Sequence, residues 1–233
     1  GAGGGGVPQN IYAEPATLRM RVYQLTLPLG AFSLNEKIWR QLDEDTLDST
    51  TTVLLAQNGL RAAVGLQDRW PAIYKILEGP GTSFQEYLCQ TDGRSSVQIV
   101  TRQNVPEQTI FYVDRDFTSL GRTFDRCDNA LRLSMSRLKD STDMLVQVEP
   151  FVILGTIDIN RDDRNMGVVR TSQQQEMNFH NLRIETRLAG KNFLVLAPLN
   201  PQGNTFSVGT HFLSASDKVP PTETILVFVP LKK

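Results

Sequence analysis

The sequence predicts an α+β protein in which a small N-terminal βαββα domain precedes a larger antiparallel all-β domain, a sandwich or a sheet. Two patterns lead to this prediction. Apolar residues recur at helical spacing in two segments before residue 82, and after residue 84 they alternate with polar residues at the period of a strand. We therefore expect a flexible glycine-rich tether at residues 1–17, the βαββα domain at 18–82 and the all-β domain at 83–233.

A strand and an amphipathic helix are expected to open the first domain. Residues 18–27 consist mostly of large or β-branched side chains and end at Pro28, which predicts a strand followed by a turn. Ser33 then stands three residues before Glu36, the spacing of a capping box, and apolar residues follow at helical spacing. We expect a helix over residues 33–45.

Two short strands and a second helix complete the predicted domain. Residues 51–56 and 60–65 are apolar segments on either side of an Asn-Gly pair, which is a strong signal for a hairpin turn. Residues 68–79 place apolar side chains on one helical face, accept proline in the first turn and end at glycine. The expected order is therefore strand, helix, strand, strand, helix.

The second domain is expected to contain strands alone. Leu131, Leu133 and Met135 alternate with polar neighbours, which is typical of an antiparallel sheet with one solvated face. Turn-forming residues separate such segments from one another. The predicted strands span residues 85–90, 96–102, 108–113, 130–138, 144–154, 175–188, 192–197, 207–213 and 222–230.

Composition limits the classes of partner. Hydrophobic residues make up 40% of the 233 residues, as in a globular protein, and 24 Lys and Arg face 25 Asp and Glu. Because the formal net charge is only -1, we expect no nucleic-acid partner. No apolar run approaches the ~18 residues that a transmembrane helix needs. The glycines of residues 1–6 fit a lipid-anchored tether and an added linker equally well, and a signal segment is absent from this numbering.

No set of residues predicts an enzyme. The two histidines, His180 and His211, are accompanied by no Gly-x-Ser-x-Gly motif, and we expect both to be structural. Residues 158–162 begin like a calcium loop, but Asp163 and Val169 stand where that loop needs glycine and glutamate, so we interpret the segment as a solvated loop. We assign no catalytic, cofactor-binding or metal-binding residue and expect no cofactor and no small-molecule substrate.

The sequence has two cysteines, Cys89 and Cys127, and their spacing matches no metal or redox motif. One disulfide in an oxidising compartment and two separate buried thiols both agree with the sequence. Cysteine usage therefore leaves the compartment open.

Short segments in both predicted domains resemble those of one protein family. Val22-Tyr23-Gln24-Leu25 and Asn58-Gly59-Leu60, with the helices around them, are similar to the βαββα ring-building periplasmic domains of bacterial secretins, the family of type II and type III secretion and type IV pili. The segments that are similar to strands of the secretin core span residues 126–133, 144–150, 190–197 and 222–230. The core appears in shortened form, because residues 207–213 replace a longer family signature and no amphipathic lipid-facing hairpin follows.

A second resemblance concerns Trp39, Asn58-Gly59-Leu60-Arg61 and Trp70-Pro71. This arrangement is similar to one in exported proteins of planctomycete-type bacteria. Together the two resemblances imply an exported protein of the periplasm or outer envelope.

The function implied by the resemblance is that of a non-enzymatic structural or assembly protein of the cell envelope. Such a protein would act by self-association or by binding protein partners through its sheet edges. One alternative is an extracytoplasmic β-domain that binds a glycan or a peptide; a hydrolase that uses His180 or His211 is another. The binding groove of the first alternative would draw on Tyr87, Phe111, Tyr112 or Phe117.

Overall fold

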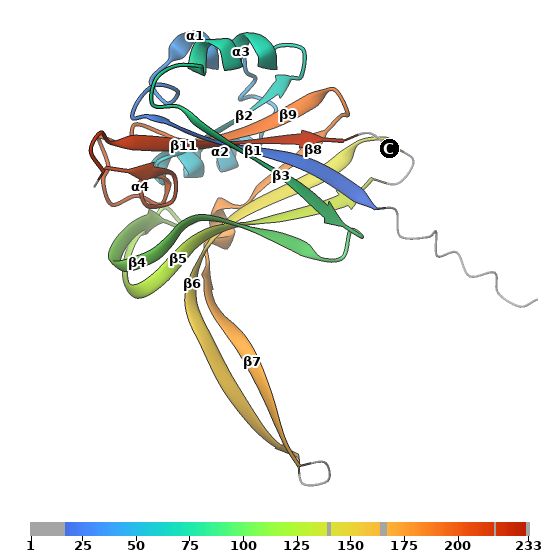
Figure 1. The fold of residues 1–233 in the computed structure, drawn as a ribbon, viewed down its shortest axis with the longest axis vertical. Coiled ribbons are helices and arrows are strands. Elements are labelled where there is room, and N and C mark those ends of the chain that lie inside the picture. The colour runs from blue at the N-terminus through green and yellow to red at the C-terminus, as the bar shows by residue number, and fades with distance from the viewer. Residues whose placement is uncertain (1–16, 139–140, 164–166, 217, 232–233) are drawn as a thin grey trace, which may run out of the picture.

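The structure is a computed structural model that describes residues 17–138, 141–163, 167–216 and 218–231, and it contains two antiparallel sheets (Figure 1). Sheet A has the strand order β2 (Leu60–Leu66), β9 (Asn192–Pro198), β11 (Thr222–Pro230), β1 (Leu18–Pro28), β3 (Ser83–Thr91), and β10 (Ser214–Ala215) pairs with β11. Sheet B has the order β4 (Ser96–Val113), β5 (Ser119–Arg137), β6 (Met144–Asp163), β7 (Gly167–Asn178), and β8 (Ile184–Leu188) pairs with β6.

The helices divide between the two faces of sheet A. Helices α1 (Glu36–Trp39) and α3 (Trp70–Leu77) cover the face that points away from sheet B, where their apolar residues join a core with Leu25, Phe193 and Val227. Helices α2 (Ser49–Gln57) and α4 (Val208–Leu213) contribute instead to the core between the sheets. A single 3-10 turn, η1 (His180–Leu182), joins β7 to β8.

The larger core fills the space between the sheets. Met20 and Val22 of β1 point into it from sheet A, and Leu131 and Leu133 of β5 point into it from sheet B. This alternation along β1 and β5 explains why their sequences read as strands with one apolar face. Both faces of sheet A are buried in its centre, so β9 is apolar from Phe193 to Pro198 and β11 from Ile225 to Pro230.

The predicted fold class is wrong, because residues 18–82 do not form a βαββα domain. Strand β1 lies between β11 and β3, and β2 pairs with β9, so strands from both ends of the chain share one sheet. The sequence patterns located strands but carried no information on which distant strands pair. The tether expected at residues 1–17 lies outside the described residues, apart from Thr17.

The strand and hairpin predicted around residues 51–65 are also corrected. Residues 51–56 belong to helix α2, whose N-terminus is capped by Asp48: its carboxylate accepts a bond from the Thr51 amide at 2.9 Å. Gly59, with φ of 72°, ends the helix instead of turning a hairpin. The β-branched run suggested a strand, but Leu54 and Leu55 fall together on the buried face of a helix.

Two further predictions fail in detail. The helix expected over residues 33–45 is reduced to α1, because the Ser33 hydroxyl donates to Glu223 at 2.5 Å and does not cap a helix. Residues 207–213, expected as a strand, form α4, whose N-cap Ser207 accepts a bond from the Thr210 amide at 3.2 Å. The helix predicted at residues 68–79 is confirmed as α3.

Strands β6 and β7 continue beyond the body of the molecule as a paired hairpin arm (Figure 1). The register shifts between Ile153 and Gly155, and Gly155 has φ of 118°, which marks a β-bulge where the arm begins. Residues 158–162, interpreted as a loop, lie on β6 within this arm, where Asp158 is paired with Ser172. That interpretation is therefore wrong for the backbone.

Candidate interaction edge and cavity

Strand β3 forms the exposed end of sheet A. Its inner edge pairs with β1 from Leu18↔Thr91 to Thr26↔Ser83, and no other described strand pairs with its outer edge. Three large side chains of β3 remain open to solvent: Phe84 is 42% exposed, Tyr87 40% and Leu88 60%. An edge of this kind offers free backbone donors and acceptors together with apolar side chains.

The opposite end of sheet A is blocked at one position. The backbone of Asp43 pairs with β2, since Asp43 N donates to Val64 O at 2.7 Å and Val64 N donates to Asp43 O at 2.8 Å. The segment before α2 therefore occupies the hydrogen-bonding position of Val64, which a further strand would need. Arg61 of β2 adds a bidentate ion pair with Glu44, and this bond raises the pKa of the arginine.

The outer edge of β4 in sheet B is covered as well. Phe111 N donates to Phe206 O at 2.8 Å, and the Asn58 side chain exchanges two bonds with the backbone of Val113. His211 Nε2 lies 2.8 Å from Thr109 O. These contacts from α2, α4 and their loops leave little of that half of β4 open for pairing.

β3 also lacks the residues that natural edge strands use against pairing. Its sequence, Ser-Phe-Gln-Glu-Tyr-Leu-Cys-Gln-Thr, contains no proline and no lysine. Its one charge, Glu86, is neutralised by Arg21 of β1 at 2.9 Å. Proline, lysine and bulges are the usual devices that prevent association at an edge. Strand β3 is thus the most open pairing edge of sheet A.

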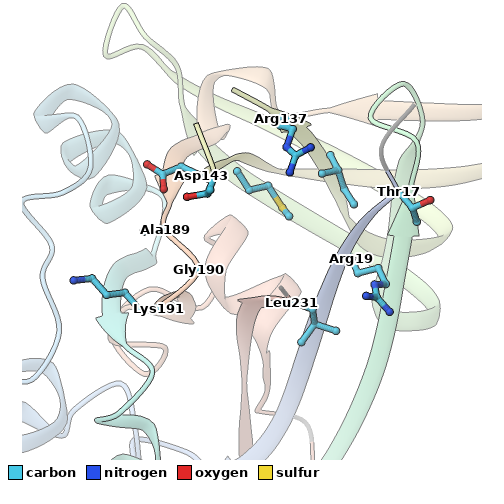
Figure 2. A pocket seen from close by; sticks show the side chains of 11 residues that line it. Thr17, Arg19, Arg137, Asp143, Ala189, Gly190, Lys191 and Leu231 are labelled. Atoms are coloured by element: carbon cyan, nitrogen blue, oxygen red, sulfur yellow. The ribbon is translucent and has the colours of Figure 1, made fainter. Parts of the chain in front are cut away.

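A cavity of about 530 Å³ lies at one end of the sandwich. It is formed where β1 and β6 begin, β5 and β11 end, and the turn between β8 and β9 crosses (Figure 2). Leu18, Met144 and Leu231 supply apolar surface. Arg19, Arg137, Lys191 and Asp143 are its charged residues.

Neither histidine is hydrogen-bonded to a nucleophilic side chain among the described residues. His180 is exposed at the surface, and its Nδ1 lies 2.9 Å from the buried carboxylate of Glu149, which also binds Arg183 at 2.7 Å. His211 contacts the Thr109 carbonyl, and burial lowers its pKa, with the charge of Arg102 acting in the same direction. These contacts supply no nucleophile for the hydrolase alternative.

The structure places both cysteines as free thiols in the core between the sheets. Burial raises the pKa of each, and Cys127 accepts a bond from Gln108 Nε2 at 3.1 Å. Thiols in such a setting behave as small apolar side chains. Of the two readings left open by the sequence, the structure has the two separate buried thiols.

The four aromatic residues of the glycan or peptide alternative lie on different sheets. Tyr87 is on β3 of sheet A, whereas Phe111 and Tyr112 are on β4 and Phe117 follows β4 in a turn. Tyr112 is partly buried against Phe179, with ring centroids 5.2 Å apart. The four aromatic side chains therefore do not line a single groove together.

In the part of the chain that the structure describes, no three His, Cys, Asp or Glu residues are grouped to hold a metal ion. Within the same residues, no helix has the length and apolar character required to cross a membrane. No family model, curated protein or solved structure matches this chain.

Sequence reasoning did not identify the open edge or the cavity. Strand β3 was located at residues 85–90, but its position at the end of a sheet depends on pairing with β1. Arg19 lies at the start of β1, Arg137 ends β5 and Lys191 precedes β9, so no motif in the sequence connects them.

Proposed function

We propose that this chain is a non-enzymatic assembly protein of the bacterial cell envelope, and that it associates with a second copy of itself through the outer edge of β3. The observation that carries the proposal is the open edge of β3, with Phe84, Tyr87 and Leu88 exposed. Pairing there extends sheet A across the contact by main-chain hydrogen bonds.

The composition of β3 suits pairing with itself. In a symmetric antiparallel contact centred on Tyr87, Glu86 faces Leu88 and Phe84 faces Gln90 of the second copy. No like charges oppose each other in this arrangement, because Glu86 is the only charged residue of the strand. Exposed Leu88 and Phe84 lose contact with water on the same face of the extended sheet.

The placement in the envelope is supported by the resemblance to secretins. The segments similar to the secretin core lie on strands: residues 126–133 on β5, 144–150 on β6, 190–197 mostly on β9 and 222–230 on β11. The ring-building half of the resemblance carries no weight, because residues 18–82 lack that fold. Fractionation of cells that make the natural full-length protein tests this part. We expect the protein with the envelope, and recovery in the cytosol alone would contradict it.

Sedimentation equilibrium over a range of concentrations tests the association. We expect a mass that rises from one to two copies in the wild-type chain and stays at one copy in Leu88→Lys, since a lysine on the edge opposes pairing. Ile76→Lys is the matched control, because Ile76 is an exposed apolar residue (47%) on α3, outside β3. A monomeric wild type, or equal masses for the two variants, would remove the proposal.

A further inference from the structure

We propose that the cavity at the end of the sandwich binds an anionic amphiphile, a molecule with an apolar chain and a carboxylate or phosphate head. This site is separate from the β3 edge in its residues and does not depend on the proposed association. Its volume, about 530 Å³, lies in the range of small-molecule sites.

The walls of the cavity are held by backbone hydrogen bonds. Leu231 N donates to Arg19 O at 3.0 Å, which fixes the end of β11 against the start of β1. Asn192 N donates to Ala189 O at 2.9 Å, which closes the turn between β8 and β9. A cavity bounded by paired backbone is largely preformed and loses little entropy on binding.

The interior of the cavity is apolar. Leu18 (8% exposed) and Met144 (7%) are buried residues that belong to the core between the sheets, and both line the cavity. Leu231 and Ala189 add partly buried apolar surface. A hydrocarbon chain that enters from the open side therefore contacts the end of the main core.

The net positive charge of the cavity residues favours an anionic head group. Three cations, Arg19, Arg137 and Lys191, stand against one carboxylate, Asp143. In Figure 2 the Arg137 guanidinium points toward the middle of the labelled residues, while Lys191 extends outward at the rim. An anionic head placed near Arg137 meets a net positive field.

The cations of the cavity have no carboxylate partner within the described part of the chain. Arg61 is paired with Glu44, Arg21 with Glu86, and Arg183 with Glu149. Among the described residues, Arg19, Arg137 and Lys191 take part in no such ion pair, and here three cations gather around one apolar cavity. An anion from outside the chain supplies the compensating charge that the neighbouring residues do not.

Isothermal titration of the full chain with dodecanoate, below its micelle concentration, tests the proposal. We expect one site, affinity that rises about fourfold for each methylene from octanoate to dodecanoate, and dodecyl phosphate binding like dodecanoate. Dodecyltrimethylammonium, which has the same chain and the opposite charge, should bind at least about tenfold more weakly. Equal binding of the cationic and anionic amphiphiles would overturn the proposal.

Variants locate the site. Arg137→Gln combined with Lys191→Gln, both at exposed positions, should weaken dodecanoate about tenfold and leave the fold unchanged by circular dichroism. The control combines Lys37→Gln with Arg40→Gln, two exposed cations at α1, and should bind as the wild type does. Equal affinity of the two double variants would place binding elsewhere and overturn the proposal.

Vesicles distinguish a free amphiphile from a membrane surface. The chain should take up monomeric dodecanoate and should show no retention on phosphatidylglycerol vesicles beyond that of the Arg137→Gln, Lys191→Gln variant. Binding to vesicles without binding to dodecanoate would assign the cations to a membrane surface and reject the cavity as the site.

Discussion

The side chain of Asn58 pairs with the backbone of Val113 as a strand would: Val113 N donates to Asn58 Oδ1 at 2.9 Å, and Asn58 Nδ2 donates to Val113 O at 3.0 Å. The same Nδ2 also donates to Leu54 O at 2.8 Å. One fully buried amide therefore joins the end of α2 to the end of β4 and covers part of the edge of sheet B.

Asn58→Ala is expected to lower the free energy of unfolding by about 3 kcal/mol, because it leaves the amide and carbonyl of Val113 without these partners. Urea unfolding followed by circular dichroism measures the change. Gln57→Ala, at the exposed neighbouring position, is the control and should stay within about 0.5 kcal/mol of the wild type. A loss below about 1 kcal/mol for Asn58→Ala would contradict the structural role.

Gly209→Ala is expected to destabilise the fold by about 3 kcal/mol. A Cβ at this position would lie 1.7 Å from the Gly59 carbonyl oxygen, and a backbone atom cannot move away as a flexible side chain can. Gly79→Ala provides the comparison, since a Cβ there meets nothing within 4 Å. Thermal unfolding of the two variants should separate them clearly; equal melting temperatures would mean that α4 does not lie this close to Gly59.

The fully buried carboxylate of Glu223 holds the turn after β1. It accepts bonds from Phe32 N at 2.6 Å, Ser33 N at 3.0 Å and the Ser33 hydroxyl at 2.5 Å. Glu223→Gln replaces one acceptor with a donor that faces these groups, and it should cost about 2 kcal/mol of unfolding free energy.

A double-mutant cycle with Ser33→Ala tests whether the loss comes from this contact. The two changes should be less than additive, since each removes the same hydrogen bond. Glu78→Gln, at an exposed position, controls for the loss of charge. Full additivity of Glu223→Gln and Ser33→Ala would argue against the contact.

His211 should make the free energy of unfolding fall as the pH is lowered. Burial lowers its pKa in the folded state below the ordinary value of 6.5, so the unfolded chain binds the proton more readily. Its contribution is complete above pH 6.5 and is lost as the pH falls through the folded-state pKa. Urea unfolding at a series of pH values from 8 to 5 should show this loss in the wild type.

The matched pair of variants is His211→Gln and His180→Gln. His211→Gln should flatten the pH dependence, because the titrating group is gone, whereas His180→Gln should retain the His211 component. Identical pH profiles for the wild type and His211→Gln would show that His211 does not titrate differently in the two states.

Local patterns in the sequence located many of the elements but not their arrangement. β1, β2, β3 and β11 and the helix α3 were predicted close to their observed positions, because apolar periodicity within one segment decides each of them. The Thr-rich segment of α2 was predicted as a strand, because β-branched residues favour strands. The sequence alone does not reveal that Leu54 and Leu55 are buried together on one helical face.

The candidate sites could not be predicted, because both arise from long-range pairing. Strand β3 is an edge because β1 is the one described strand that pairs with it, and the cavity exists only where the starts of β1 and β6 meet the end of β11. No local pattern specifies which strands pair when they are far apart in the chain.

Hydrogen exchange of the backbone amides in Ser83–Thr91 shows whether two copies associate through β3, since it reports on the β3 edge itself. The wild-type chain is compared at a concentration where it is monomeric and at one where its mass has doubled. We expect slower exchange in β3 at the higher concentration and unchanged exchange in β2, where Val64 is already paired with Asp43. A doubled mass with unchanged exchange in β3 would contradict it.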